Sequence, residues 1–504
     1  MKHVLIYLLI LLAFQVYAQR THHCGTDAAA LNYLGQQLLA NRAISYIESR
    51  NEITYLPVTF HLVANDGGIG RVRESNVLDQ LCQLNIDFRP YDIQFYLQEL
   101  NYVDNSILYE THRDDENLLI RQRNNASINV FILKEANNSN EVENGRTLGY
   151  FNTQRDWLIM RRDQINDRSI VLTHEVGHFL GLLHPYNGWD FEPWTEEMHG
   201  NPAPTRSPRG ISTERMDGSN CQQSGDFLCD TPPDYFFAFD RAENEDCEYQ
   251  GGARDPDGVL VDPDELNYMA NFLDQCEREA YYFSEEQVAI MKSNIQSPQR
   301  DYLRTEFSPE RITSEEEVLL NFPRDNETIP TFNLVPLEWS PVEGATQYLV
   351  EVDRVRSFNV QTRRVVTDQN SLELSDLDAR RQYYWRVRPF NAYNTCTEFS
   401  PPSVFRTGLV KDTTQLPLIE DWNIAPNPVR YTEPLSIDIV TQRSFATRVQ
   451  VIDALGRVVL EEIQFITPSD RQLFLDLPNL GVGAYFVVVQ TSEARAVRKV
   501  VVVE

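Results

Sequence analysis

Long apolar runs are scarce in this chain of 504 residues. The run Val4–Phe14 is too short for an ordinary membrane-spanning helix, and no other stretch approaches the roughly 18 apolar residues that a span needs. Lys2 and His3 precede this run, and Val16–Ala18 supplies the small residues of a cleavage site, which is typical of a secretory signal peptide over residues 1–18. We therefore expect an exported protein without a transmembrane segment.

Basic residues are also under-represented, with 45 Lys and Arg against 74 Asp and Glu and a formal net charge of −29. Such a charge argues against nucleic acid as a partner and favours solubility and calcium binding. The length predicts three or four domains. Cysteines number only seven, an odd count that leaves at least one free or paired to another molecule in an oxidising compartment.

Histidine is rare, with nine residues, yet three of them fall within Thr173–Pro185, which reads T-H-E-V-G-H-F-L-G-L-L-H-P. His174 and His178 are four residues apart, so on a helix they lie on one face, one turn from each other. Gly181 can end that helix in a left-handed conformation and allow His184 to reach the same point. The spacing predicts three converging imidazoles.

Three neutral imidazoles around Zn²⁺ leave a fourth position open for water, and Glu175 beside them can accept a proton from that water. The full pattern H-E-x-x-H-x-x-G-x-x-H arises by chance in a chain of this length about once in ten thousand cases or less. The hypothesis is metal-assisted hydrolysis of peptide bonds, and the alternative is a degenerate, inactive zinc site.

Residues 19–50 are too few to hold a core of their own and are helix-prone over Ala28–Ile47. We interpret them as a propeptide. Cys24 near its start could place a thiolate in the open position of the zinc and displace the catalytic water. A disulfide or an idle thiol is the alternative for this residue.

A catalytic domain is predicted over residues 51–300. Its helix with His174 should begin near Asp167 or Ser169. Gly149–Phe151 and Trp157–Met160 are predicted edge strands, to which a substrate peptide could add as a further strand. The other expected elements are strands at Ile53–Val63, Ile93–Leu100 and Ile128–Leu133 and helices at Ser75–Phe88 and Ser284–Ile295.

Loop-forming residues dominate from Tyr186 to Asp264, which suggests a subdomain held by disulfides. Cys221, Cys229, Cys247 and Cys276 lie in or just after it, and four cysteines allow three connectivities. Leu266–Met269 follows His184 by about 80 residues, the place where proteins with the long histidine motif carry the methionine of a tight turn.

These motifs together resemble the pappalysin family of metzincins, and in particular its secreted bacterial branch, the cytophagalysins. The resemblance covers about Cys24–Ile295 and rests on T-H-E-V-G-H-F-L-G-L-L-H, S-G-D-F-L-C-D-T-P, L-N-Y-M and the Cys-Gly-Thr head. It implies an α+β metzincin zincin catalytic domain. It also implies zinc ligands, a general base, a Met-turn and a cysteine switch, namely His174, His178 and His184, Glu175, Met269 and Cys24.

Further sites follow from the same resemblance. It implies a calcium site with Asp226, Asp230 and Thr231, a disulfide Cys247–Cys276, and local pairing of Cys221 with Cys229. The acidic run Asp255–Glu265 also favours calcium binding. One departure is that Ala270 and Asn271 follow Met269, where the family usually has Asp-Tyr, whose tyrosine helps to stabilise the oxyanion.

Asp274 lies two residues before Cys276 and is a candidate for the specificity pocket. A fixed carboxylate there would select Arg or Lys after the scissile bond, and the resemblance implies cleavage before basic residues. The Ser49–Arg50 bond would then be a site of autolytic propeptide removal. Asp274 could instead be an exposed loop residue or a calcium ligand.

Two all-β sandwich domains are predicted after a linker at residues 301–329. Residues 330–408 alternate in short strands with an early tryptophan and resemble a fibronectin type III domain, which we interpret as a spacer rather than a binding module. After a second linker at 409–421, residues 422–504 resemble the C-terminal sorting domain of the type IX secretion system. This resemblance rests on P-N-P, D-A-L-G-R and G-A-Y, and an ordinary β-sandwich is the alternative.

The sequence thus predicts a secreted zinc endopeptidase with protein or peptide substrates, exported across the outer membrane by the type IX machinery. A surface adhesion or binding protein on a silent metzincin scaffold is the alternative. Glu175 favours the enzyme, because a binding protein has no need of a base beside the metal.

Overall fold

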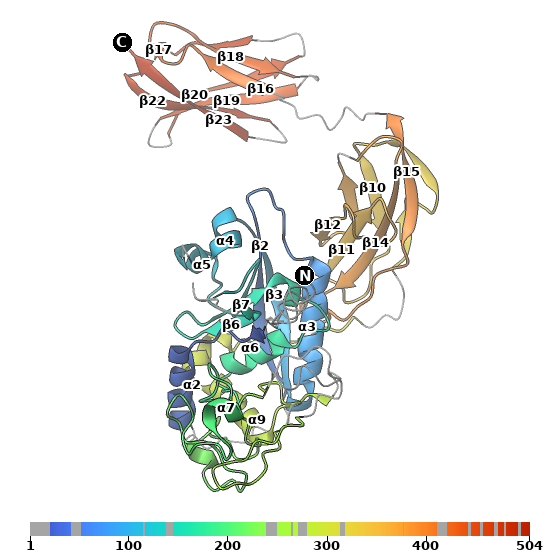
Figure 1. Cartoon of the computed structure of the whole chain (residues 1–504). Coiled ribbons are helices and arrows are strands. Elements are labelled where there is room, and N and C mark those ends of the chain that lie inside the picture. Colours follow the sequence, from blue (N-terminus) through green and yellow to red (C-terminus); the bar gives the residue numbers. More distant parts are fainter. Residues whose placement is uncertain are drawn as a thin grey trace, which may run out of the picture.

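A region of mixed helices and strands comes first and two all-β regions follow it (Figure 1). The predicted fold class, an α+β domain followed by two all-β sandwich domains, is confirmed. No helix in the described part of the chain is long and apolar enough to cross a membrane. The computed structural model describes residues 21–41, 52–113, 116–137, 145–237, 249–263, 266–270, 280–312, 318–375, 377–410, 421–441, 445–453, 457–467, 472–477, 480–491 and 495–504.

A five-stranded sheet in the order β3-β2-β4-β7-β6 organises the first domain. Its strands are β2 (Thr54–Ala64), β3 (Ile93–Asp104), β4 (Ile128–Leu133), β6 (Gly149–Asn152) and β7 (Trp157–Arg161). All neighbouring pairs are parallel except β6 and β7, so the last edge strand runs against the others. This edge lies next to the helix that carries the histidine motif.

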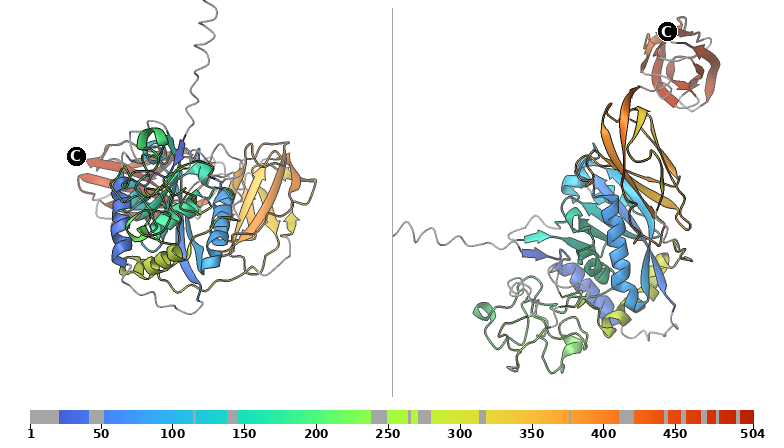
Figure 2. Two further views of the ribbon diagram at one scale, coloured as in Figure 1. Left: turned by 60° about the horizontal axis from the view of Figure 1, so that its bottom comes forward. Right: turned by 90° about the vertical axis from the view of Figure 1, so that its right-hand side faces the viewer.

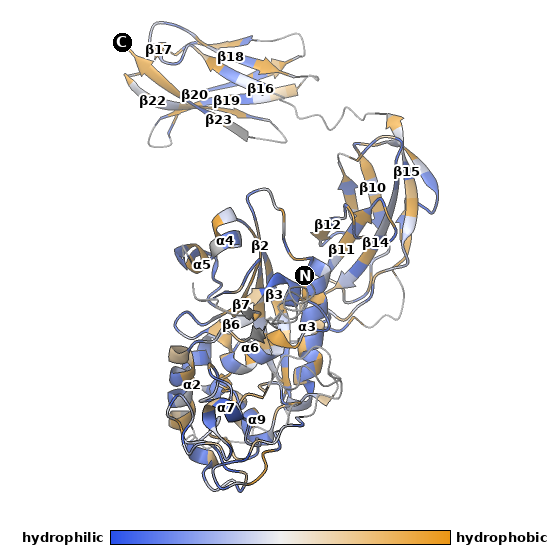
Figure 3. Cartoon of the chain, viewed as in Figure 1, coloured by the Kyte–Doolittle hydropathy of each residue, from blue (hydrophilic) through white to orange (hydrophobic). Residues whose placement is uncertain are grey.

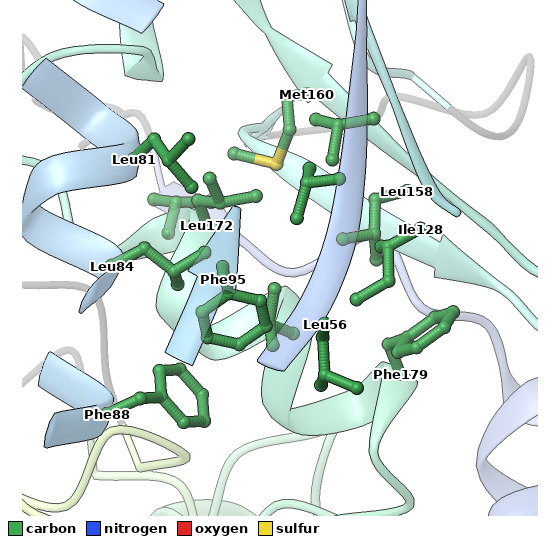
Figure 4. Packing of buried hydrophobic residues seen from close by; sticks show 14 of the residues in the cluster. Leu56, Leu81, Leu84, Phe88, Phe95, Ile128, Leu158, Met160, Leu172 and Phe179 are labelled. Carbon is green, nitrogen blue, oxygen red and sulfur yellow. The ribbon is translucent and has the colours of Figure 1, made fainter. Parts of the chain in front are cut away.

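Helices α3 (Glu74–Phe88) and α6 (Val171–Phe179) pack on this sheet through apolar positions spaced three and four residues apart. Burial of these side chains, at roughly 1.5–3 kcal/mol each, supplies most of the driving force. Figure 4 shows the layer between helices and strands, to which Leu81, Leu84, Phe88, Leu56, Phe95, Ile128, Leu158, Met160, Leu172 and Phe179 contribute.

Helix α9 (Glu285–Gln296) is capped by Ser284, whose hydroxyl accepts a bond from the Gln287 backbone N–H, while the Gln287 side-chain oxygen accepts one from the Ser284 N–H. The remaining elements of the first domain are short apart from one helix of 14 residues. They are β1 (Thr21–His23), α2 (Ala28–Asn41), η1 (Arg89–Tyr91), α4 (Ser106–Thr111), α5 (Glu116–Gln122), β5 (Gly145–Thr147), η2 (Arg162–Gln164), α7 (Glu196–His199), η3 (Cys221–Gln223) and η5 (Pro298–Leu303).

The N-terminal segment belongs physically to this domain. Helix α2 buries Leu31 and Leu34 in the same apolar cluster as the sheet. The backbone of Gly35 lies so close to Phe227 and Leu183 that an added Cβ would contact both side chains. The helix is described as far as Asn41, and the rest of the expected helix, to Ile47, lies outside the described residues.

Between Leu180 and Pro263 the described residues, which leave out 238–248, form mostly turns and short bridges, as the composition predicts. Cys221 and Cys229 are joined by a disulfide. A separate apolar cluster holds the segment together, because the loops have no sheet to pack against. Its most deeply buried members are Tyr186, Trp189, Tyr235, Phe237, Ala253 and Val261.

The second domain is a sandwich of two sheets with strand orders β13-β10-β8 and β12-β11-β14-β15-β9. Trp339 and Trp385 lie at the centre of its core. Its strands are β8 (Leu320–Phe322), β9 (Glu327–Thr331), β10 (Val335–Trp339), β11 (Gln347–Asp353), β12 (Arg363–Thr367), β13 (Ser371–Leu374), β14 (Gln382–Phe390) and β15 (Ser403–Val410).

This arrangement corrects the linker expected at residues 301–329. Strand β8 and most of β9 fall inside that range, yet they pair with β10 and β15. The polar, acidic composition of residues 311–328 and the proline at 323 favour a linker there, because proline interrupts ladder hydrogen bonds. Strand β9 lies at an edge of its sheet, where Pro330 is tolerated.

The second domain is bound to the first by contacts that the sequence did not reveal. A disulfide joins Cys82 of α3 to Cys396. Arg388 of β14 forms an ion pair with Asp79 of α3 at 2.7 Å, and Phe390 lies in the core cluster of the first domain. The two domains accordingly lie side by side along α3 in Figure 2.

The third domain pairs two sheets with orders β16-β18-β21 and β17-β23-β22-β19-β20. Buried and more exposed positions alternate along β18, and Figure 3 shows this mixture of apolar and polar residues along the strands. The strands are β16 (Asp421–Ala425), β17 (Val429–Arg430), β18 (Leu435–Val440), β19 (Phe445–Asp453), β20 (Val458–Ile466), β21 (Gln472–Leu475), β22 (Gly483–Gln490) and β23 (Arg495–Val503).

The Cys82–Cys396 bond generates a prediction about stability. We expect the double substitution Cys82→Ser and Cys396→Ser to cost about 2–5 kcal/mol, because this disulfide closes a very long loop in the unfolded chain. The control, Cys221→Ser with Cys229→Ser, opens a bridge with a sequence separation of only 8 and should cost less. Thermal melting under non-reducing conditions measures both, and an equal or smaller loss for the long-range pair would contradict the prediction.

Candidate metal centre

Helix α6 begins at Val171, whose backbone N–H donates to the hydroxyl of Ser169 at 3.3 Å. It ends after Phe179, and Gly181 then takes a φ of 99°. Residues other than glycine rarely adopt this backbone conformation. A Cβ at this glycine would also meet Asn294 of α9. The chain therefore reverses here, as the motif predicts, and returns His184 to the helix.

Three imidazole rings meet at the end of this reversal. The Nε2 atoms of His174, His178 and His184 are separated by 3.0, 3.1 and 3.0 Å, and all three rings are buried. Tetrahedral ligands at the usual zinc–nitrogen distance lie about 3.3 Å apart. The spacing therefore fits one metal ion bound by the three nitrogens.

The opposite nitrogen of each ring has a defined acceptor. The Nδ1 atoms of His174 and His178 lie 2.8 Å from the carbonyl oxygens of Tyr268 and Leu182. The Nδ1 atom of His184 lies 2.7 Å from the Asp190 carboxylate. Since each Nδ1–H donates to its acceptor, the Nε2 lone pairs point at one another, as metal ligands require.

The environment also keeps two of these rings, His174 and His178, neutral. Burial, reinforced by the neighbouring imidazoles, holds the pKa values of His174 and His178 well below the usual range. Protonation therefore does not relieve the repulsion between converging lone pairs. The donor set fits a cation at this point.

Glu175 lies on the same helix, against the edge strand β6. A Cβ on Gly149 would come within 3.2 Å of the Glu175 side chain, so glycine leaves room for the carboxylate. Burial raises the pKa of Glu175 to about 8. Its Oε1 atom is buried without a hydrogen-bond partner among the described residues, which leaves an oxygen able to accept a proton.

Cys24 of the N-terminal segment lies beside the histidines and Glu175. Its Sγ lies 3.5 Å from His178 Nε2 and 3.8 Å from Glu175 Oε2. Burial, and then the Glu175 charge, raise the pKa of this thiol well above its usual range. Cys24, His174, His178 and His184 form a group of potential ligands, and no second such group occurs in the described ranges.

The segment around Cys24 continues the sheet edge. Strand β1 pairs in parallel with β5, and the Gly25 N–H donates to the Gly149 carbonyl of β6 at 2.9 Å. A side chain at Gly25 would overlap Thr147 and approach Tyr150, so this position requires glycine. Thr26 accepts a bond from the Phe151 N–H at 3.3 Å.

Met269 lies below the histidine helix in a tight turn, where Ala270 N–H donates to the Asn267 carbonyl at 2.9 Å. Its sulfur is packed so closely against Gly177 that no Cβ could be added there. Asn271, Asp274, Cys276 and Cys247 lie outside the described residues.

The residues expected at the calcium site are placed in two groups. Thr231 donates to Asp226 at 2.9 Å, whereas both oxygens of Asp230 accept bonds at the start of α9, from Ser284 and from the Glu286 N–H, each at 2.7 Å. The buried neighbour of Asp226 is Glu214. Burial raises the pKa of Asp226 to about 7, and burial together with the Asp226 charge raises that of Glu214.

Asp190 and Glu214 are therefore functional candidates that sequence reasoning missed. Asp190 lies six residues after His184, so a carboxylate soon after the last histidine was an available signal. Glu214 gave no signal, because only folding of the loop places it beside Asp226.

Comparison with protein families identifies the two C-terminal domains. Residues 423–503 match the family "Secretion system C-terminal sorting domain". Residues 339–411 match the family "Rha78A-like, N-terminal immunoglobulin domain", so the second sandwich is immunoglobulin-like.

Several curated extracellular metalloproteases are similar to the chain. One from Verticillium alfalfae is 27% identical over 198 residues, which cover 34% of this chain and 67% of the relative. One from Arthroderma gypseum is 26% identical over 242 residues, covering 44% of this chain and 69% of the relative. Among solved structures, a Tannerella forsythia promirolysin mutant is similar at 16% identity and a TM-score of 0.36, covering 55% of this chain and 90% of that one.

The histidine cluster and these similarities agree on one class of protein. The chain carries a secreted metalloprotease domain with a cluster of three histidines, followed by an immunoglobulin-like domain and a C-terminal sorting domain for export by the type IX secretion system.

Proposed function

We propose that this chain is a zinc-dependent endopeptidase of the pappalysin family, made as a latent precursor whose propeptide spans residues 19–50. The convergence of three buried Nε2 atoms within 3.1 Å of one another, with Glu175 beside them, carries the proposal. Three imidazoles that leave a fourth position for water are a donor set that suits catalytic zinc.

His174, His178 and His184 would hold the zinc, which when bound acidifies water and polarises the scissile carbonyl. Glu175 accepts the proton of the attacking water and later returns it to the leaving amine. Its buried position and raised pKa, about 8, suit a group that must both take and release a proton near neutral pH.

Strand β6 is the part of the domain best suited to bind the substrate. It is a sheet edge, and an extended peptide can pair with such an edge through its backbone. Gly25 and Thr26 already use backbone groups of Gly149 and Phe151 on this strand. A substrate and the N-terminal segment would therefore compete for the same edge.

Latency follows from the position of Cys24. A thiolate beside the three histidines would take the fourth zinc position and exclude water. The thiol has a raised pKa in these surroundings, so a cation is needed to hold it as thiolate. We infer that Cys24 acts as a cysteine switch.

Calcium would bind the loop subdomain through Asp226, with Thr231 and Asp230 nearby and Glu214 added from the structure. Glu214 and Asp226 are both buried, and the Asp226 charge adds to burial in raising the pKa of Glu214. A divalent cation between carboxylates would remove this repulsion.

Asp274 is proposed to line the pocket for the residue after the scissile bond. Its carboxylate would select Arg or Lys, and the Ser49–Arg50 bond would then be an autolytic maturation site.

The central test is Glu175→Gln. We expect this variant to retain one zinc per chain and to lose about 10²–10⁴-fold or more in hydrolysis of a denatured protein substrate, because the ligands stay while the proton acceptor goes. Metal analysis and turnover are measured together, with Glu197→Gln on exposed α7 as the matched control. Near-normal turnover would rule out the role of Glu175, and an inactive zinc-loaded wild type would favour a silent binding protein.

The switch is tested by Cys24→Ala. We expect the full-length precursor to mature faster than wild type, because no thiolate holds the fourth zinc position. The time course of propeptide loss is followed on gels, with Gln36→Ala, an exposed position of α2, as control. Identical time courses for all three proteins would exclude a switch at Cys24.

The calcium proposal predicts that the effect of Glu214→Gln on thermal stability depends on calcium. Glu214→Gln should melt no lower than wild type in a calcium chelator, since one buried charge is removed, and should gain less when calcium is added. A bound ligand at 100 times its Kd stabilises by about 2.7 kcal/mol. Calorimetric melting with and without calcium measures this, with Glu197→Gln as control. A wild-type melting curve unaffected by calcium would remove the idea.

The specificity proposal predicts that wild type cleaves before Arg and Lys and that Asp274→Ala loses this preference, because no carboxylate pairs with the cation. Cleavage products of a peptide library are identified by mass spectrometry, with Asp262→Ala as the control. N-terminal sequencing should place the mature start at Arg50. An unchanged preference in Asp274→Ala, together with a start far from Arg50, would contradict the proposal.

A further inference from the structure

Arg209 connects the N-terminal segment to the histidine cluster. Its Nη1 atom donates to Asp190 Oδ2 at 3.0 Å and to Asn187 Oδ1 at 3.1 Å. Its Nη2 atom donates to Asn32 Oδ1 at 2.8 Å and to the Ala28 carbonyl at 3.4 Å, both on α2. One guanidinium thus bonds both to the metal-site loop and to the predicted propeptide.

The loop side of this contact leads directly to His184. Asp190 is 3% exposed, and its other carboxylate oxygen accepts from His184 Nδ1 at 2.7 Å. The other two histidines are oriented by backbone carbonyls, so His184 alone depends on a charged side chain for its orientation. A buried carboxylate needs a compensating charge, and Arg209 supplies it.

The guanidinium is held in place for this task. Its side chain is 14% exposed, its plane lies near the Phe191 ring, and the Arg209 N–H donates to the Gly188 carbonyl at 3.3 Å. Only arginine has donors arranged to reach two sets of acceptors at once. A lysine could satisfy Asp190 but could not also span to α2.

We propose that Arg209 is a positioning residue that couples the N-terminal segment to the metal: it orients Asp190, which orients His184, and Asn32 and the Ala28 carbonyl orient Arg209 in the precursor. This inference rests on the proposed zinc site. It adds a second attachment of the propeptide, independent of Cys24, through which loss of the propeptide loosens one metal ligand.

The test measures zinc transfer from the full-length chain to a chromogenic chelator. The reference carries Cys24→Ala and Glu175→Gln, so neither thiol ligation nor autolysis contributes. Adding Arg209→Gln should speed zinc loss about 10–100-fold, the usual effect of removing a residue that supports a metal ligand. Arg209→Lys should stay nearer the reference, because the charge beside Asp190 is kept.

The propeptide side is tested by Asn32→Ala, which should speed zinc loss by about 3–10-fold through loss of one bond to a charged donor. Gln36→Ala, also exposed and one turn further along α2, is the matched control and should match the reference. Circular dichroism and melting confirm that each variant is folded. Asn32→Ala touches no core residue, so it stays informative if Arg209→Gln fails to fold.

Three outcomes are distinguished. Faster zinc loss in Arg209→Gln and Asn32→Ala, but not in Gln36→Ala, supports the coupling. A folded Arg209→Gln that releases zinc at the reference rate, or an Asn32→Ala that behaves as Gln36→Ala, overturns it. A reference chain that binds no zinc overturns the proposed function instead, and with it the basis of this inference.

Discussion

The requirement that three buried imidazole lone pairs face one point governs the first domain. At separations of 3.0–3.1 Å the nitrogen lone pairs repel one another unless a cation lies between them, and burial keeps His174 and His178 from relieving the repulsion by protonation. The arrangement persists because each ring is fixed from behind by Tyr268, Leu182 or Asp190. The reversal at Gly181 places the Leu182 carbonyl, the turn at Met269 places the Tyr268 carbonyl, and Gly188 and Arg209 hold the Asp190 carboxylate.

The N-terminal segment uses the same surfaces that catalysis would need. Strand β1 and Gly25 extend the sheet edge at β5 and β6, Cys24 approaches the histidines, and α2 shares the core of the domain. Each contact is modest by itself, but together they combine backbone pairing, apolar burial and a position beside the metal site. Release of such a segment would open the edge strand and the metal site together, which suits an enzyme exported in latent form.

The immunoglobulin-like domain is bound firmly to the first domain. A flexible spacer would share no core with its neighbour, whereas this domain contributes Phe390 and Leu349 to the first core and is bound by the Cys82–Cys396 disulfide. Arg388 adds an ion pair to α3, the helix that packs behind the sheet. These contacts could not be predicted from the sequence, because alternating strands indicate a sandwich but not the surface against which its outer face packs.

Local chemistry in the sequence determined the histidine helix, the glycine reversal, the strands β2, β4 and β7, and the order of three domains, since period, spacing and turn residues act over short distances. Only the tertiary structure decided which distant groups meet. Asp190 with Arg209 and Asn32, Glu214 with Asp226, and Cys82 with Cys396 are pairings that depend on how loops and domains pack. Strands β8 and β9 could likewise not be predicted from their own sequences, because pairing with a neighbouring strand makes them extended.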